Sequence, residues 1–220
     1  MEIFAKESSK IEFCGVQNLS ENVFNISDRK AVTEKDSLIE WIICDIGGGV
    51  TKSDVITYLN GEGSSVKNIG LFLGKDNQQF DFSVTAVHKS AHTLSDMLTK
   101  GALTGKSKSV YRGYIKIKNT APKSSGYQKA DMLLLSPNAE ADPIPNLEID
   151  NNDIEKCTHG ATVGQIDKEK LFYMMSRGLT EKDATKQVVN GLFSPAMSRI
   201  NSDLIKNNLN EILEKKMENL

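Results

Sequence analysis

Between about Ile11 and Ile149 the sequence shows almost no helical periodicity of apolar residues. The region consists of short segments of extended character that end at glycine or asparagine turns. In one such segment, alternate residues share a face at the strand period of two: Phe80, Phe82, Val84, Ala86 and His88. A later segment places Tyr111, Ile115 and Ile117 on one side and Arg112, Lys116 and Lys118 on the other. Many short strands predict a sandwich, a barrel or a solenoid, and without a strict repeat the pattern alone leaves all three open.

Two prolines interrupt the end of this β region. Short apolar runs at 132–136 and 146–150 have the composition of strands. Because proline cannot donate to a sheet ladder, Pro143 and Pro145 predict a turn between these two strands.

The pattern changes after Gly164, where apolar residues take helical spacing. Asp167 is suited to cap a first helix, and Gly178 stands where that helix would end. Thr180 is followed three residues later by a carboxylate, which predicts a second helix through about Leu192.

Ser194 and Pro195 then predict the start of a third helix, as its N-cap and its first residue. The tail carries an apolar stripe at helical spacing: Met197, Ile200, Leu204, Leu209, Ile212, Leu213 and Met217. Together these patterns divide the chain into an all-β core over residues 1–165 and a helical subdomain over residues 166–220.

Composition narrows the function classes. A net charge of −2 argues against general nucleic-acid binding, and the basic run 104–118 alternates as a solvated strand face does. No apolar run approaches the roughly 20 residues that cross a bilayer, and no signal-peptide pattern is present, so we expect a cytoplasmic protein without a membrane partner. Three scattered cysteines, Cys14, Cys44 and Cys157, fit free thiols in a reducing compartment.

Three features resemble chemical sites but fail on spacing or context. The run "GALTGKS" at 101–107 has three residues between its glycines where a phosphate-binding loop needs four, so we expect no nucleotide site. The glycines at 47–49 more simply mark a turn. His88, His92 and Asp96 have the spacing of helix-face metal ligands, but His88 ends an alternating strand and is expected to be a hydrogen-bonded strand-end histidine.

Cys157 and His159 are the strongest candidates for chemistry. In an extended segment, residues two apart project from the same face, which brings the thiol and the imidazole side by side. Both groups suit iron or zinc, although two ligands do not complete a tetrahedral site. A nucleophilic Cys–His pair and two ordinary core residues are the alternatives, and the residues alone leave all three open.

Five ordered stretches of the chain resemble the SufB/SufD family of iron–sulfur cluster assembly proteins. The most specific is "NNDIEKCTHGATVGQIDKEKLFYMMSRGLTEKDA" at 151–184. The others are "NVFNISDRKAVTEKDSLIEW", "GGGVTKSDVITYLNGEG", "FDFSVTAVHKSAHTLSDMLTKGALTGKSKSVYRGYIKIKNTA" and "KADMLLLSPNAEADPIPNLEI". The resemblance extends from about residue 18 to residue 193.

The resemblance implies a right-handed parallel β-helix core with a C-terminal α-helical subdomain. In this family, SufB and SufD pair through the core, and their helical regions dock on the ATPase SufC. The resemblance places the SufC-docking surface at Leu171, Phe172, Tyr173, Arg177, Gly178 and Leu179. The alternative for this segment is plain helix core, formed by Leu171, Phe172, Met175 and Val188, with a polar face left for the partner.

Two positions make the chain similar to the SufD branch in a short form. Gly160 stands where the SufB branch usually has a glutamate, and Ala130 stands where that branch has a cluster-linked cysteine. Typical members of the family are about twice as long and carry an additional N-terminal helical region.

The resemblance therefore implies a non-catalytic scaffold subunit. His159, accompanied by Cys157, would face a transient iron–sulfur cluster at an interface with a SufB-like partner, and the isolated chain would hold no cluster stably. The rival hypothesis is a homodimeric structural β-helix that binds SufC but nucleates no cluster. A β-helix enzyme, such as a polysaccharide lyase or esterase, would need a set of catalytic residues along one solenoid face, and the sequence shows none.

Overall fold

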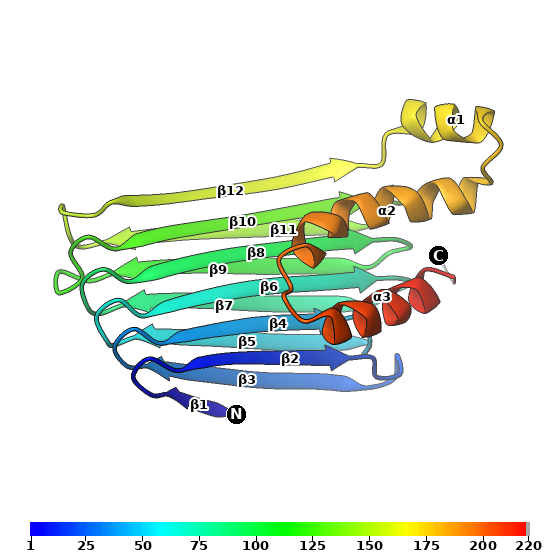
Figure 1. Cartoon of the computed structure of the whole chain (residues 1–220). Helices are drawn as coiled ribbons and strands as arrows, with labels where there is room; N and C mark the ends of the chain where they lie inside the picture. Colours follow the sequence, from blue (N-terminus) through cyan, green and yellow to red (C-terminus); the bar gives the residue numbers. More distant parts are fainter. Residues whose placement is uncertain (219–220) are drawn as a thin grey trace.

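The computed structural model, which describes residues 1–218, is a parallel β-helix whose strands wind into two six-stranded sheets (Figure 1). One sheet has the order β1-β3-β5-β7-β9-β11 and is called sheet A, and sheet B has the order β12-β10-β8-β6-β4-β2. Sheet A contains β1 (Glu2–Ala5), β3 (Phe24–Thr33), β5 (Val50–Leu59), β7 (Gln79–His88), β9 (Lys108–Ile117) and β11 (Glu140–Ile149). Sheet B contains β2 (Lys10–Gln17), β4 (Leu38–Asp45), β6 (Ser65–Gly74), β8 (Leu94–Leu103), β10 (Ser125–Leu134) and β12 (Lys156–Gln165). The fold that the resemblance implied is confirmed.

Alternation along each strand explains why the chain takes this form. In β7 and β9 the predicted inward residues are buried or half-buried, and Arg112 and Lys118 on the opposite face are exposed. Strands β4, β6 and β8 depart from strict alternation because sheet B is covered on its outer face as well. Strands buried on both faces become nearly continuous apolar runs, as the sequence of β4 shows.

The corners of the solenoid repeat, although the sequence shows no strict repeat. Once in each coil a residue takes a left-handed conformation with φ between 53° and 69°: Asp36, Gly63, His92 and Lys123. The next residue is always a buried hydroxyl residue: Ser37, Ser64, Thr93 and Ser124. These hydroxyls bond within and between coils, and the pair Thr93–Ser124 is 2.7 Å apart. The repeat was hidden because only the backbone conformation and the hydroxyl recur, while the left-handed residue varies.

The turn predicted at Pro143 and Pro145 is wrong, because both prolines lie inside β11. Strand β11 is the last strand of sheet A, and Glu140 N donates to Ser107 O while Asp150 N donates to Ile117 O. Backbone N–H and C=O groups point to alternate sides along a strand. Those of the even-numbered residues of β11 therefore point toward β9, and the backbone of the two prolines lies on the side of the free edge. There a missing N–H costs no ladder bond.

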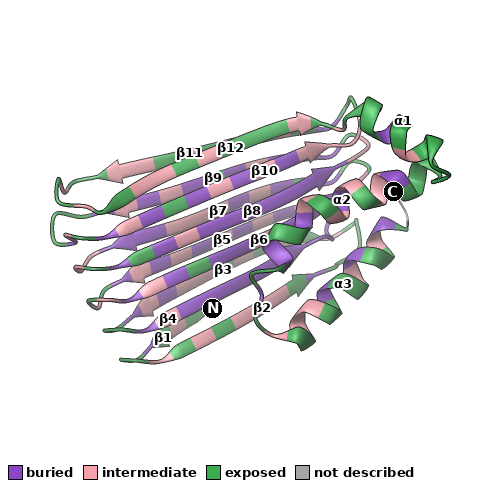
Figure 2. Cartoon of the chain, turned by 45° about the horizontal axis from the view of Figure 1, so that its top comes forward, coloured by how far each residue is buried: buried purple, intermediate pink, exposed green. Residues whose placement is uncertain are grey.

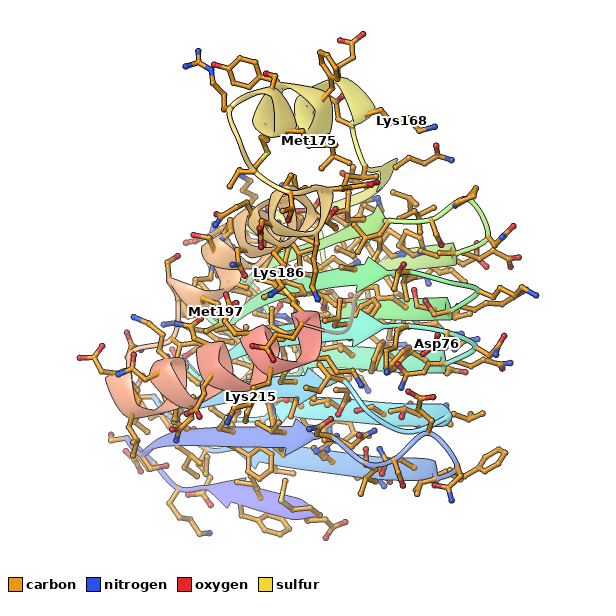
Figure 3. All side chains as sticks on the ribbon, turned by 90° about the vertical axis from the view of Figure 1, so that its right-hand side faces the viewer. Asp76, Lys168, Met175, Lys186, Met197 and Lys215 are labelled. Carbon is orange, nitrogen blue, oxygen red and sulfur yellow. The ribbon has the colours of Figure 1, made fainter. Side chains whose placement is uncertain are left out.

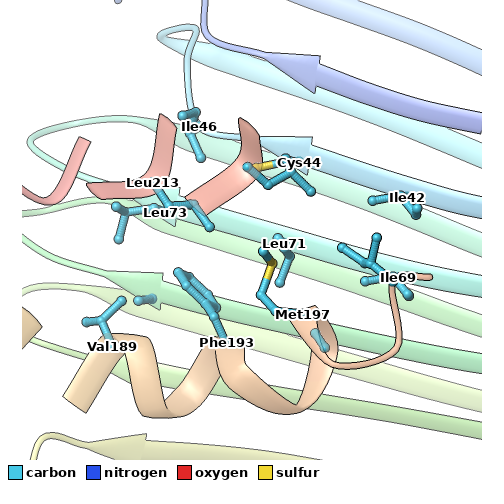
Figure 4. Packing of buried hydrophobic residues seen from close by; sticks show 14 of the residues in the cluster. Ile42, Cys44, Ile46, Ile69, Leu71, Leu73, Val189, Phe193, Met197 and Leu213 are labelled. Carbon is cyan, nitrogen blue, oxygen red and sulfur yellow. The ribbon is translucent and has the colours of Figure 1, made fainter. Parts of the chain in front are cut away.

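Three helices follow the last coil: α1 (Lys168–Ser176), α2 (Glu181–Met197) and α3 (Asp203–Met217). Helices α2 and α3 lie across the outer face of sheet B (Figure 2), and their apolar sides join the strands in one buried cluster. Phe193, Met197 and Leu213 meet Cys44 and Leu71 in this cluster (Figure 4). The division into two parts at residues 165 and 166 stays a prediction, since this cluster joins the helices to the solenoid.

Helix starts were predicted better than helix ends. Asp167 and Thr180 are N-caps as expected, and Gly178 follows α1 at φ 98°. The third helix predicted at Ser194 and Pro195 is wrong at its start: α2 continues to Met197 with Pro195 inside it, and α3 begins at Asp203. Pro195 removes the bond that its N–H would make to the carbonyl of Gly191, and the packing of Phe193, Ala196 and Met197 in the cluster offsets that cost.

The predicted apolar stripe fails at one residue. Leu204 is 72 % exposed in the first turn of α3, and the neighbouring Ile205 packs against the cluster instead. The stripe otherwise holds, because Ile200, Leu209 and Leu213 are buried.

Candidate functional site

Cys157 and His159 lie on β12, the last strand of sheet B (Figure 1). Their side chains project toward the interior of the solenoid, as the pairing of β12 with β10 shows. The register pairs Cys157 with Gly126 and His159 with Gln128, both of which point inward from β10. The prediction that thiol and imidazole share one face is therefore confirmed. No further coil covers β12 within the described residues, so this pair sits at an open end of the solenoid.

The two side chains have different surroundings. Cys157 is half-buried against the interior cluster, and its Sγ lies close to Gly126, where an added Cβ would come within 3.2 Å of it. Burial raises the pKa of the Cys157 thiol, so it is protonated at neutral pH. His159 is exposed. The arrangement presents an accessible imidazole beside a thiol that needs a partner charge to ionise.

The pair alone does not form a metal centre. Within residues 1–218 no group of three or more histidine, cysteine, aspartate or glutamate side chains is placed to hold a metal ion. Nor is a third side chain bonded to His159 in the described part of the chain, which a nucleophilic pair would need for orientation. A metal at this position would need further ligands from outside residues 1–218.

The backbone of β12 is open along one side. Ile166 N donates to Leu134 O. The backbone N–H and C=O groups of the even-numbered residues of β12 therefore point toward β10. The N–H and C=O groups of Cys157, His159, Ala161 and Val163 therefore point to the free edge. In contrast to β11, this edge contains no proline. Such an edge is a template for pairing with another chain.

The inward residues of the last coil form the surface around this edge. We call this surface the last-coil face; it consists of Ala141, Pro143, Pro145, Leu147, Ile149, Cys157, His159, Ala161 and Val163. Most of it is apolar, and Ile149 and Val163 are at least 40 % exposed. The face resembles the cut end of a core more than an ordinary protein surface.

The second candidate surface, the predicted SufC-docking segment, is α1 with the turn that follows it. Helix α1 stands away from the strands, with Lys168 and Met175 at the far end of the molecule (Figure 3). Leu171 is buried, as the core alternative expected, but the same alternative is wrong for Phe172 and Met175, which are exposed. Phe172 is 74 % exposed and has Tyr173 beside it.

Arg177 organises part of this surface. Its guanidinium lies 5.2 Å from the centre of the Tyr173 ring, and its Nη2 donates to the Tyr173 hydroxyl at 3.1 Å. Gly178 ends the helix, and Leu179 directly after it is also exposed. An exposed apolar patch with an ordered cation suits a protein partner, because such patches are uncommon on surfaces that face only water.

The other histidines are separated by the fold. His88 is buried at the end of β7, where Nδ1 lies 2.9 Å from Thr93 Oγ1 and Nε2 lies 2.9 Å from Ser95 Oγ. This confirms the strand-end interpretation. Burial lowers the pKa of His88 to about 4, so the ring is neutral at pH 7. His92 is exposed in a corner, and Asp96 faces outward to bind Arg199 at 2.8 and 2.9 Å.

The remaining sequence features are structural. Residues 101–107 complete β8 and turn the next corner, and the glycines at 47–49 form a corner in which a Cβ on Gly47 would meet Leu19 N at 2.2 Å. The basic run behaves as a solvated strand face. Three of its outward cations bind a carboxylate on a neighbouring strand: Lys108 with Glu140, Arg112 with Asp81 and Lys116 with Glu148.

Sequence reasoning missed a set of polar side chains inside the solenoid. Asp45, Asn68 and Tyr111 are buried there, and polar atoms of each lack a partner within the described residues. The signal was present, because Trp41, Ile43 and Asp45 are two apart and share the inward face of β4.

No helix within residues 1–218 combines the length and the apolar character that spanning a membrane requires.

Comparison with known proteins adds a family to this geometry. Residues 1–192 match the family described as "SUF system FeS cluster assembly, SufBD core domain". Iron–sulfur cluster assembly protein SufD of Bacillus subtilis is 28 % identical over 218 residues, which cover 99 % of this chain and 50 % of that protein. Bacillus subtilis SufB is 30 % identical over 195 residues, covering 89 % of this chain and 42 % of SufB. A SufBD family protein of Mycobacterium tuberculosis is 29 % identical over 218 residues, 99 % of this chain and 26 % of the relative. The chain thus spans a quarter to a half of the length of these relatives.

Proposed function

Because the chain belongs to the SufBD family of the SUF system for iron–sulfur cluster assembly, we propose that it is a non-catalytic subunit of that system's scaffold in the cytoplasm. The iron–sulfur cluster would be its cargo, formed at a subunit interface and held stably only by the assembled complex. The observation that carries the proposal is the position of Cys157 and His159 on the last strand, at the open end of the solenoid.

Pairing through the last-coil face is the first part of the proposal. The free edge of β12 offers backbone donors and acceptors, and the apolar residues around it gain from burial. A SufB-like subunit or a second copy of this chain would add a strand to β12 and cover Val163 and Ile149. The edge of β11 is less suited to this, because Pro143 and Pro145 remove two of its outward donors.

The second part concerns the cargo. Once a partner covers the last-coil face, the exposed His159 would lie in the interface, where its imidazole can bind iron. The partner would supply thiolate and carboxylate ligands. Cys157 would contribute a thiolate only after a nearby positive charge or metal offsets the burial that raises its pKa.

The third part is docking of a SufC-like ATPase on α1. Phe172, Tyr173 and Leu179 form the exposed apolar patch, and Arg177 is held against Tyr173. Aromatic and arginine side chains of this kind dominate binding energy at protein interfaces. ATP hydrolysis by the partner would then move the subunits and open the cluster interface.

A SufD-like role is the finer assignment that we favour, and a homodimeric structural role is the second candidate. Gly160 faces outward on β12 and Ala130 faces inward on β10, in register with Ala161. Neither position offers the carboxylate or thiol expected of the SufB branch. Ala130 also favours the homodimeric role, since two copies would lack the interface cysteine altogether.

Edge substitutions test the pairing. Ala161→Pro removes one N–H from the free edge of β12 and leaves the bonds to β10 intact, whereas Ala141→Pro makes the same change on β11. We expect Ala161→Pro to abolish co-purification with a SufB-like partner and self-association in light scattering, and Ala141→Pro to preserve both. Unchanged pairing of Ala161→Pro would exclude β12 as the pairing edge.

A matched pair of substitutions tests SufC docking. Phe172→Ala is expected to weaken binding of the ATPase about 10-fold or more, as for an interface hot spot. Leu204→Ala, which removes a similarly exposed apolar side chain from α3, should leave the affinity unchanged. Equal affinities for the two variants would move the docking surface away from α1.

A further inference from the structure

A cavity lies inside the solenoid, between the coils that carry β4 to β9. Its volume is about 30 Å³, measured as the space open to the centre of a water molecule. Ile43, Phe72 and Phe82 form part of an apolar wall. Asp45, Asn68, Thr99 and Tyr111 also line it, together with Ser53. None of its lining residues belongs to the last-coil face or to α1, so neither proposed surface accounts for it.

Four polar atoms at this cavity have no protein partner. They are both carboxylate oxygens of Asp45, Nδ2 of Asn68 and the hydroxyl oxygen of Tyr111. All three side chains are at least nine-tenths buried. Leaving a buried polar group unpaired is unfavourable, and more so where the group is charged. Four such atoms around one cavity indicate that something polar occupies it.

Charge around the cavity favours an occupant that donates to Asp45. Burial raises the pKa of Asp45, and the Arg29 guanidinium counteracts this effect. Arg29 reaches the cavity wall, because its Nη1 donates to Ser53 Oγ at 2.9 Å. Ser53 Oγ accepts this bond and keeps its own O–H, which also lowers the pKa of Asp45. Neither carboxylate oxygen of Asp45 has a protein donor within hydrogen-bond geometry, so both are open to the occupant.

Water meets these requirements and the alternatives do not. The lining presents acceptors on Asp45 and donors on Asn68 and Tyr111, and a water molecule can serve both at once. A cation would be repelled by Arg29 and would leave the Asn68 N–H without an acceptor. An apolar ligand would leave all four atoms unpaired. The cavity has room for water. Two water molecules offer enough donors and acceptors for the four unpaired atoms.

We propose that this cavity is an internal hydration site for two ordered water molecules, bound by Asp45, Asn68 and Tyr111. One water donates to each carboxylate oxygen of Asp45. The waters accept from Asn68 Nδ2 and from the Tyr111 hydroxyl, and they bond to each other. Every polar atom left unpaired by the protein at this cavity then has a partner, so the waters are a structural part of the solenoid.

A crystal structure of the wild-type chain tests the site directly. We expect two density peaks in the cavity, about 2.7–3.2 Å from the oxygens of Asp45 and from Asn68 Nδ2. An empty cavity overturns the proposal. A single peak surrounded by several oxygens at about 2.3–2.6 Å also overturns it, because that geometry belongs to a cation such as calcium.

Water oxygen-17 magnetic relaxation dispersion provides a solution test that needs no crystal. The double variant Asp45→Leu, Asn68→Leu removes three of the four unpaired atoms, and it should contain two fewer long-lived waters than the wild type. The control Tyr114→Phe changes a tyrosine on the outer face of β9 and should keep the wild-type number. An equal number in all three proteins contradicts the proposal. If the double variant does not fold, the wild-type density decides.

Discussion

Replacing Phe193 with alanine should test whether the helices and the solenoid form one folded unit. Phe193 is 2 % exposed and is the one aromatic side chain among the described members of the cluster that joins α2 and α3 to β4, β6 and β8 (Figure 4). Truncating a buried phenylalanine costs about 3–5 kcal/mol, from lost burial and from the cavity left behind. For a chain of this length, that loss lowers the melting temperature by about 10 °C.

Urea unfolding followed by two probes measures this effect. Trp41 is the single tryptophan, lies buried inside the solenoid and donates to Thr57 Oγ1 at 3.0 Å, so its fluorescence reports on the core. Far-ultraviolet circular dichroism at the helical minimum reports on α2 and α3. Because the cluster belongs to both parts, we expect Phe193→Ala to shift both transitions to lower urea together.

The exposed Phe172 supplies the control, since Phe172→Ala should change the free energy of unfolding by less than about 0.5 kcal/mol. The reasoning is refuted if Phe193→Ala costs less than about 1 kcal/mol. It is also refuted if the helical signal shifts while the Trp41 transition stays at the wild-type position, because the helices would then unfold independently of the solenoid.

Two further predictions concern the interior. His88 is buried in the neutral form and its pKa is lowered to about 4, so as the pH falls the histidine is protonated in the unfolded chain before it is protonated in the folded one. The contribution of His88 to the free energy of unfolding is therefore complete above about pH 6.5. It declines by about 3 kcal/mol in all as the pH falls to about 4. Urea unfolding across this range should show the decline in the wild type and a smaller one in His88→Gln; equal slopes would contradict the assignment. Gly101→Ala would place a Cβ 2.0 Å from the Phe72 ring and should cost more than about 1 kcal/mol, whereas Gly160→Ala meets nothing within 4 Å and should be neutral by the same measurement.

Much of the local structure could be predicted because it depends on near neighbours. The period of two identified the inward faces of β7 and β9, and side-chain caps located the starts of α1 and α2. The end of α2 was misplaced because Ser194 and Pro195 also fit a helix start, and only packing against sheet B decides that the helix continues. Leu204 was placed in the core for the same reason, since α3 is anchored by Ile205 instead.

The solenoid could not be deduced from periodicity, although its repeat is present. The left-handed corner position holds aspartate, glycine, histidine or lysine in successive coils, so residue identity conceals a recurring conformation. A search for a hydroxyl residue at intervals of about 30, from Ser64 to Thr93 to Ser124, would have found it. In this case the resemblance to a known family supplied the fold before periodicity did.

The candidate site was predictable in its pairing but not in its setting. The spacing of Cys157 and His159 was sufficient to place both on one face of a strand. That this strand is the last of its sheet depends on the order of the sheet, which no local pattern encodes. The exposure of Phe172 likewise depends on how α1 packs, since α1 contacts α2 and stands away from the strands.

The central claim is that His159 serves an iron–sulfur cluster at a subunit interface. The most direct measurement is anaerobic reconstitution of the chain, co-expressed with a SufB-like partner and a SufC-like ATPase, with iron and sulfide. Cluster absorbance is compared among the wild type, His159→Ala and the control His92→Ala, which changes an exposed histidine in a corner. We predict that His159→Ala loses most of the cluster while the complex remains intact, and that His92→Ala matches the wild type. Full cluster content in His159→Ala would contradict the claim.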